Sequence, residues 1–139
     1  MARKIFYHMS RTKLPINTPL KSRGSTHVDP HVEKMLTARK PDPSIARSEG
    51  VYLGETEDAS RHGLTYDYGY LHTVEPVGDL QRRDSNWVGQ LQLRHHRNPK
   101  MVQMQDKRLI GISDEQIADR YWAGEASPNP NWANRGGSR

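Results

Sequence analysis

Two aspartates, Asp79 and Asp84, stand in a polar segment that follows a stretch with strand character. Residues 69–75 alternate between two faces, Pro76 cannot donate a ladder hydrogen bond, and Gly78 permits a turn. A strand that leads into a polar loop is a usual place for groups that do chemistry. The sequence therefore offers two candidate carboxylates near the end of a central strand. The alternative at this point is an ordinary strand followed by a turn.

His8 and Tyr52 are the other residues whose types could serve a site. His8 ends a short strand pattern over residues 4–8, and Tyr52 lies in a second pattern over residues 50–54. Tyrosine supplies a flat aromatic face with little loss of entropy, and histidine supplies a hydrogen-bonding ring. If the two serve one site, both side chains should enter a shared cleft from neighbouring strands, and a slip of one residue would turn either to the wrong face. The alternatives are a histidine at a strand edge and an ordinary core aromatic.

Two helices that would support these strands have clear local signals. Asp29 can cap a helix and Pro30 suits its first position, which predicts a helix from about 30 to 40. Ser113 begins a capping box, which predicts a helix over residues 114–123.

The rest of the chain has weaker patterns. Residues 88–99 are polar and rich in histidine and arginine, which favours a long loop, and residues 101–104 and 108–112 could pair as late strands. We expect one domain over residues 1–126, followed by a tail over residues 127–139 that is rich in proline, asparagine and glycine.

The composition points to a small domain with a modest core. The chain has 139 residues, of which 33% are hydrophobic, and a mean hydropathy of -0.95. Its net charge of +5 favours either a polyanionic partner or a solvated surface. It has no cysteine, which excludes disulfides and thiolate metal sites. No apolar run approaches the roughly 18 residues of a membrane span, and no signal peptide is visible, so we expect a cytoplasmic protein.

Several common site types do not fit the sequence. His95 and His96 are adjacent and would point to opposite faces of a strand, and no third ligand stands at a useful spacing. We therefore expect no metal. Neither of the common glycine-rich phosphate loops is present, which argues against a Rossmann or P-loop nucleotide site.

The order of the short motifs resembles the rifampin ADP-ribosyltransferase family, small enzymes of the diphtheria-toxin class. The resemblance rests on three islands and one later residue: Phe6-Tyr7-His8, Val51-Tyr52-Leu53, Val74-Glu75-Pro76-Val77-Gly78 and Asp84. The match covers roughly residues 5 to 87. The late capped helix with Tyr121-Trp122-Ala123-Gly124-Glu125 is similar to the corresponding part of phage-encoded relatives.

This resemblance implies an NAD site and a role for each matching residue. His8 would hydrogen-bond the ribose and carboxamide, Tyr52 would stack on nicotinamide, and Asp84 would stabilise the ribosyl cation. Tyr7 and Arg11 would line the NAD site. Asp79 and Glu75 are rival carboxylates, although Glu75 looks structural in the family. Because Asp84 is on a polar loop, it should contribute little to folding.

The fold implied is α+β, with split, mostly antiparallel sheets that form an NAD cleft and short flanking helices. The activity implied is mono-ADP-ribosyl transfer, from NAD as co-substrate to an unidentified acceptor, in a bacterial or phage-infected cell. Water as acceptor would make the same residues an NAD hydrolase. The sequence predicts an anionic acceptor, a protein or nucleic acid, from four arginines: Arg82, Arg83, Arg94 and Arg97. The alternative function is a non-catalytic nucleic-acid- or virion-associated protein on the same scaffold.

Overall fold

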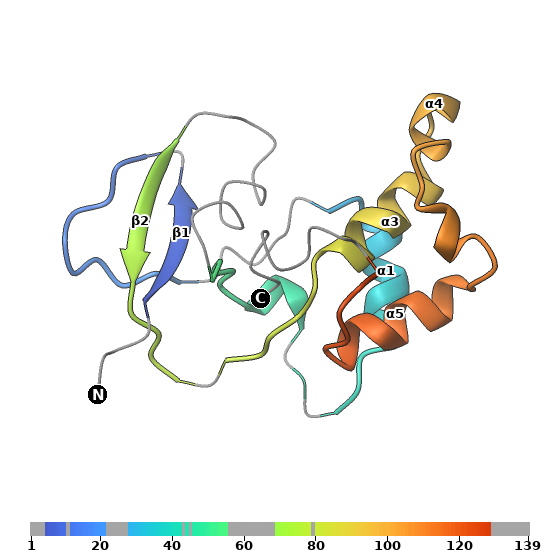
Figure 1. Ribbon diagram of the computed structural model, residues 1–139. Coiled ribbons are helices and arrows are strands. Elements are labelled where there is room, and N and C mark those ends of the chain that lie inside the picture. The colour runs from blue at the N-terminus through green and yellow to red at the C-terminus, as the bar shows by residue number, and fades with distance from the viewer. Residues whose placement is uncertain are drawn as a thin grey trace.

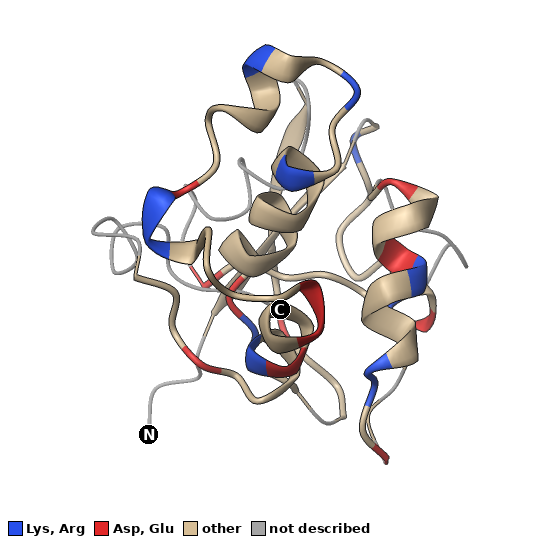
Figure 2. Cartoon of the chain, turned by 90° about the vertical axis from the view of Figure 1, so that its right-hand side faces the viewer, with Lys and Arg blue, Asp and Glu red and all other residues tan. Residues whose placement is uncertain are grey.

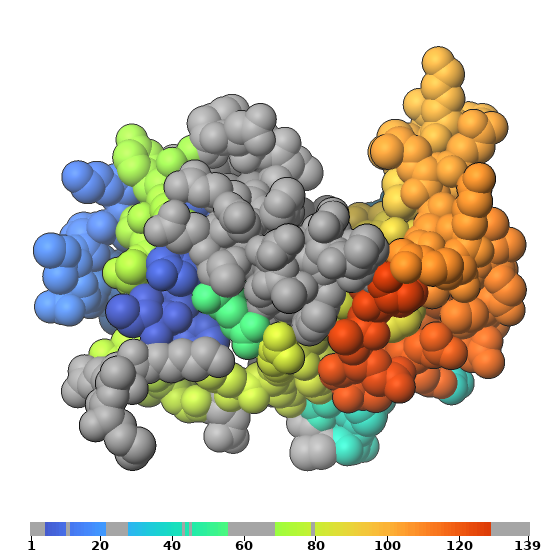
Figure 3. All heavy atoms as spheres, in the orientation of Figure 1, coloured from blue at the N-terminus to red at the C-terminus, as the bar shows by residue number. Residues whose placement is uncertain are grey.

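The fold was analysed in a computed structural model, which describes residues 5–10, 12–21, 28–42, 44, 46–55, 69–78 and 80–128. The described residues form an α+β protein with a two-stranded antiparallel sheet and helices α1, α3, α4 and α5. The sheet lies on one side of the molecule and the helices on the other (Figure 1). In the space-filling view, α4 and its neighbours project from the helical side (Figure 3). The α+β class that the sequence implied is confirmed.

The sheet consists of β1, Phe6–Ser10, and β2, Tyr70–Val74. The strands pair antiparallel with His8 directly opposite His72. On the other edge of β1, Tyr7 and Gly54 exchange two backbone hydrogen bonds of 2.9 and 2.8 Å. The early and central strands are therefore confirmed, but the strand expected over 50–54 is a single bridge. Within the described residues there is one sheet, not two.

The two helices with strong capping signals form where the sequence predicted them. Helix α1, Pro30–Ala38, has Pro30 at its first position, and the Asp29 side chain accepts a hydrogen bond of 2.8 Å from the His31 N–H. Helix α5, Asp114–Trp122, begins with the predicted capping box, in which Ser113 and Gln116 each accept from the other's backbone N–H. These signals are local, so they hold whatever the rest of the chain does.

The segment expected to be a loop and late strands is helical instead. Helix α3, Asn86–Arg94, is followed by the short helix α4, Pro99–Val102, and by the 3₁₀ helix η2, Lys107–Leu109. Trp87, Val88 and Leu91 share the buried face of α3, a spacing typical of a helix. The polar residues between them and Gly89 conceal this pattern, and the prediction of a loop was wrong for that reason.

The core lies among α1, α3, η2 and α5. It is built from ten buried residues: Val32, Leu36, Trp87, Val88, Leu91, Leu109, Ile117, Ala118, Tyr121 and Trp122. The Trp122 indole N–H donates to the Leu36 carbonyl at 2.8 Å, and that of Trp87 donates to the Glu125 carbonyl at 2.8 Å. The two tryptophans thus bury their rings with their polar atoms satisfied.

The folded part extends slightly beyond the boundary expected at residue 126. Ser127 is only 6% exposed, and its backbone N–H donates to the Asp84 carboxylate at 2.7 Å. Residues 129–139 lie outside the described residues. Among the described residues, no helix has the length and apolar character needed to cross a membrane.

Candidate functional site

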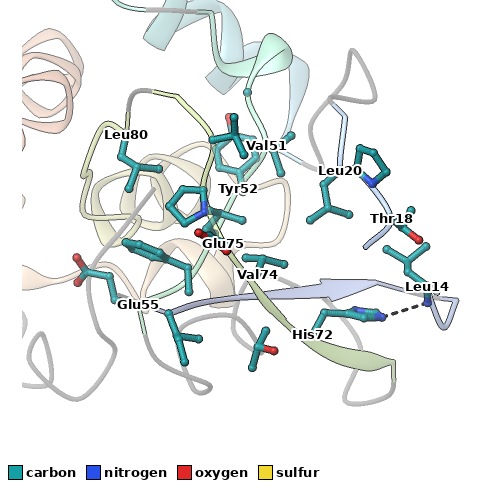
Figure 4. Close-up of a pocket in the computed structure, with 18 of the residues that line it drawn as sticks. Leu14, Thr18, Leu20, Val51, Tyr52, Glu55, His72, Val74, Glu75 and Leu80 are labelled. Atoms are coloured by element: carbon teal, nitrogen blue, oxygen red, sulfur yellow. Dashed lines mark hydrogen bonds between the residues drawn. The ribbon is translucent and has the colours of Figure 1, made fainter. Parts of the chain in front are cut away.

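A broad cleft runs along the sheet side of the molecule. It encloses about 1860 Å³, more than the roughly 300–1,000 Å³ of most small-molecule pockets. Its walls come from residues 13–20, called the strap below, from β2, from the segment 46–55, and from residues 75–77 and 80–83, with Tyr121 and Trp122 of α5 also contributing. Figure 4 shows side chains from the first four of these parts around it.

The structure brings His8 and Tyr52 together. Nδ1 of His8 lies 2.9 Å from the backbone carbonyl oxygen of Tyr52, because the segment that holds Tyr52 runs beside β1. Since a carbonyl only accepts, Nδ1 carries the proton in this contact. Of the two side chains, Tyr52 is the one among the described cleft-lining residues. The sequence predicted that His8 and Tyr52 share a cleft, but only Tyr52 lines it in this arrangement.

Tyr52 is fixed from the helical side by Arg47. The Arg47 guanidinium lies 5.2 Å from the centroid of the Tyr52 ring, and the Tyr52 hydroxyl donates to the Arg47 carbonyl at 2.7 Å. The same guanidinium binds both carboxylate oxygens of Glu33, at 2.9 and 3.0 Å, and donates to the Tyr121 hydroxyl. Tyr52 is thereby connected to α1 and α5. A cleft aromatic held this firmly is pre-organised for stacking.

The electrostatics of this cluster favour a charged arginine. Burial lowers the pKa of Arg47, but its neighbours, Tyr121 foremost, outweigh burial and raise that pKa above its ordinary value. Burial also raises the pKa of the Tyr121 hydroxyl. Arg47 therefore stays protonated and Tyr121 stays neutral, which preserves the hydrogen bonds from Arg47 to Glu33 and to the Tyr121 hydroxyl.

Asp84 does not line the cleft among the described residues. It is 3% exposed, Oδ1 accepts from the Asn86 N–H at 2.9 Å, and Oδ2 accepts from the Ser127 N–H at 2.7 Å. The carboxylate thus joins the start of α3 to the chain that follows α5. Asp84 does stand on a loop, as the sequence indicated, but its side chain is buried and not at the surface, because the loop leads directly into a helix that the sequence did not reveal.

The other expected site residues are placed as follows. Tyr7 is half-buried, and its backbone pairs with Gly54. Arg11 and the rival carboxylate Asp79 lie outside the described residues. Arg94 is largely buried, and it donates to the Leu109 and Ile112 carbonyls at 2.8 and 2.7 Å. Arg94 is therefore a structural residue. It is not available to contact the anionic acceptor substrate that the sequence predicted.

Three other carboxylates do line the cleft: Glu49, Glu55 and Glu75. Glu55 and Glu75 both belong to its wall and are labelled in Figure 4. Glu55 forms an ion pair of 2.9 Å with Arg82, which also lines the cleft. Sequence reasoning missed Glu55, although it directly follows Gly54, the residue bridged to β1. Glu75 is the rival carboxylate that looks structural by the family resemblance.

His72 is a second histidine that the sequence did not single out. It lies directly opposite His8 in the sheet and lines the cleft. Its Nε2 accepts a hydrogen bond of 3.1 Å from the Leu14 N–H, drawn in Figure 4, which ties the strap to β2.

Within the described part of the chain, no three histidine, aspartate or glutamate side chains form a group suited to a metal ion. His95 follows α3 and binds Asp114 at 2.9 Å.

Comparisons with protein-family models, with curated proteins and with solved structures find no match to this chain.

Proposed function

We propose that this protein is an NAD-dependent mono-ADP-ribosyltransferase. The observation that carries the proposal is the hydrogen bond between His8 and the Tyr52 backbone, beside a cleft that Tyr52 lines. This places two of the three residues named by the sequence resemblance on adjacent segments, although they are 44 positions apart. The proposal includes a finer architecture, a split sheet around an NAD cleft. The bridge between Tyr7 and Gly54, on the edge of β1 away from β2, would be the beginning of its second part.

The reaction breaks the bond between nicotinamide and its ribose and joins the same ribose carbon to a nucleophile of the acceptor. Nicotinamide leaves with the electron pair of the broken bond. Because the transition state resembles an oxocarbenium ion, the protein has to position NAD and stabilise positive charge. The Tyr52 ring supplies a face for nicotinamide, and His8 supplies a hydrogen-bonding ring for ribose or carboxamide after a small rearrangement toward the cleft.

The carboxylate role passes from Asp84 to Glu75 in this proposal. Both oxygens of Asp84 are already bound to backbone N–H groups in a buried position. Glu75 is exposed on the cleft wall, directly after β2, where a bound ribose can approach it. Glu55 is the second candidate, since it lines the same cleft beside Arg82.

The acceptor is proposed to be anionic. Arg82 and Arg83 line the cleft, and exposed Arg97, Lys100 and Lys107 lie on the projecting part that carries α4. Figure 2 shows Lys and Arg gathered along that part. Transfer should therefore weaken as salt rises, because exposed charges are screened beyond about 8–10 Å near physiological ionic strength.

The decisive test is incubation of the protein with NAD labelled on its adenosine moiety and a bacterial lysate. A labelled macromolecule supports transfer, and labelled free ADP-ribose alone supports hydrolysis of NAD. Glu75→Gln should lower turnover by about 10²–10³ with little change in NAD affinity, as expected for a group that acts in the transition state. Tyr52→Phe keeps the ring and should retain activity, whereas Tyr52→Leu should weaken NAD binding.

The competing function is a non-catalytic binding protein for nucleic acid, favoured by the structural use of Asp84 and by the exposed lysines and arginines beside α4. NAD at a hundredfold over its dissociation constant stabilises a binding protein by about 2.7 kcal/mol. An unchanged melting temperature at millimolar NAD, together with binding of an oligonucleotide, would support this second function and exclude the first.

A further inference from the structure

The sheet has an outer edge along β2, because β1 lies between β2 and the segment that carries Gly54 (Figure 1). Tyr7 exchanges both of its backbone hydrogen bonds with Gly54, so its N–H and C=O point away from β2. The direction of these groups alternates along a strand. Phe6 and His8 therefore point theirs toward β2, and His8 and His72 form a hydrogen-bonded pair. The same alternation in β2 turns every second residue outward.

Leu71 and Thr73 are those outward residues. Together they present two N–H donors and two C=O acceptors on the outer edge, at a spacing of about 7 Å. In the described part of the chain, neither residue has a backbone hydrogen bond on that side. Thr73 is exposed and Leu71 is half-buried. A strand edge with a row of unpaired groups is a template on which a further strand can form.

The cleft follows this outer edge. All five residues of β2 line it, although their side chains point alternately to the two faces of the sheet. Of β1, which is described throughout, the cleft touches Phe6 at its beginning and none of the four residues that follow. A space that reaches both faces of β2 but not the inner strand passes around the edge of β2. The unpaired groups of Leu71 and Thr73 therefore face the cleft.

Large exposed apolar side chains gather around the same space. Five of the seven such side chains in the described part of the chain line the cleft: Ile5, Ile16, Tyr70, Val77 and Leu80. Figure 4 shows Leu80 there together with the less exposed Leu20 and Val74. Exposed apolar side chains gathered in one place are typical of a binding surface for another protein. A free strand edge beside them fits an extended polypeptide, whose backbone pairs with the edge and whose side chains supply specificity.

Lys13 adds a preference for negative charge. It is exposed and lines the cleft, and the next residue, Leu14, donates to the ring of His72 in the middle of β2. Within the described residues, its ammonium has no ion pair. Glu75 stands directly after β2, at the other end of the edge. The preference for an acidic side chain is therefore confined to the part of a ligand that lies beside His72.

We propose that the outer edge of β2 binds an extended polypeptide segment as an additional strand. The backbone of the segment pairs with Leu71 and Thr73, its apolar side chains pack on the exposed apolar residues of the cleft, and an acidic side chain lies near Lys13. That this segment belongs to the protein that accepts ADP-ribose rests on the proposed function, whereas the binding itself does not. The cleft, at about 1860 Å³, exceeds most small-molecule pockets and leaves room for a polypeptide beside NAD.

The test uses an amidated heptapeptide, Thr-Val-Thr-Val-Asp-Val-Thr, with fluorescein at its N-terminus. Fluorescence anisotropy should show that it binds the wild-type protein. The same peptide N-methylated at every residue should not bind, because it has no backbone N–H to donate. Hydrogen exchange of the Leu71 and Thr73 amides should slow when the unmodified peptide is bound, which places the peptide on this edge.

Thr73→Pro blocks the edge in the protein itself. Proline is tolerated where the N–H of an edge strand faces outward, so the bonds between β2 and β1 remain. Loss of this donor should weaken peptide binding about tenfold or more. The matched control Thr73→Val keeps the backbone N–H and should bind like wild type.

Lys13→Gln tests the charge preference. It should weaken binding of the peptide about two- to fivefold, as expected for an exposed ion pair, and leave binding of the analogue with asparagine in place of aspartate unchanged. Lys34→Gln is the control, since it removes an exposed charge outside the cleft and should bind both peptides like wild type. Equal losses for both peptides in Lys13→Gln would overturn the acidic preference.

The melting temperature of each variant is measured first. If Thr73→Pro does not fold, the N-methylated peptide still tests the proposal. Equal binding of the unmodified and N-methylated peptides would overturn it, as would no binding of the unmodified peptide at millimolar concentration. Self-association of the wild-type protein that Thr73→Pro abolishes, without peptide binding, would assign the edge to a second copy of this chain and would overturn the proposal as well.

The outcome is separable from that of the proposed function. Peptide binding that needs the edge of β2, without transfer from labelled NAD, supports this site and refutes the enzyme. Equal transfer by wild type and Thr73→Pro, with no peptide binding, supports the enzyme and refutes this site.

Discussion

The helices and the sheet side of this molecule are built in different ways. All ten residues of the core come from α1, α3, α5 and η2, whereas β1 contributes Phe6 and Met9 as buried hydrophobic residues. Several large apolar side chains on the sheet side are exposed, among them Ile16, Val77 and Leu80, at 93%, 100% and 53%, although Met104 and Ile110 on the helical side are exposed as well. The helical half holds the main hydrophobic core, and the sheet half presents most of the cleft.

Arg47 links the two halves. Its side chain binds Glu33 of α1 and Tyr121 of α5, while its carbonyl accepts from Tyr52 on the cleft wall. The cleft aromatic is therefore oriented by the helical core. A weak sheet can hold a defined site when its key side chain is fixed from the other half.

The largest expected effect is on the core. Leu36→Ala should lower the free energy of unfolding by about 2–5 kcal/mol, because a fully buried leucine leaves a cavity. The matched sheet-side change, Leu80→Ala, removes a side chain that is 53% exposed and should be clearly milder. Urea denaturation measures both, and equal losses would contradict the division into two halves.

The next effect concerns Asp84. The sequence predicts that its loss hardly changes stability, whereas the structure predicts a clear loss. Asp84→Ala leaves the Asn86 and Ser127 N–H groups without their acceptor, which should destabilise the protein by about 1–3 kcal/mol. Asp42→Ala is the control, since its carboxylate is fully exposed, and should stay within about 0.5 kcal/mol. If Asp84→Ala melts like wild type but transfers nothing, Asp84 is the catalytic carboxylate after all.

A smaller effect depends on pH. Burial raises the pKa of Asp114, but hydrogen bonds from Arg94 and His95 outweigh it and hold the pKa below its ordinary value. The stabilisation is therefore complete above the ordinary carboxyl pKa of about 4 and is lost as the pH falls through the lowered value. At pH 6, Asp114→Asn should lower the free energy of unfolding by at most about 1 kcal/mol, and this difference from wild type should shrink below pH 4. Urea denaturation at the two pH values measures it. A constant difference across that range would refute the ion pair as its cause.

The smallest effect is expected on the strap. Ile16→Ser should change stability by no more than about 0.5 kcal/mol, since the side chain is 93% exposed. Thermal melting checks this. A loss as large as that of Leu36→Ala would mean that the strap packs against a partner in solution.

The sequence by itself determined the elements whose signals are local. The Asp29 cap, Pro30 and the capping box at Ser113 lie within one helical turn of the ends they define, so α1 and α5 could be read directly. Strand alternation likewise located β1 and β2. The order of the short motifs points to His8 and Tyr52 as a pair, and the His8 ring does contact the Tyr52 backbone carbonyl.

Only the tertiary structure decided the use of the polar residues. Asp84 is bound by a residue 43 positions later, and His72 by a residue 58 positions earlier. Helix α3 has Trp87, Val88 and Leu91 on a face that is buried only because α1 and α5 pack against it. A hydrogen bond or a buried face between distant segments leaves no local pattern, because the partner that satisfies each group is chosen by the fold and not by its neighbours in the chain.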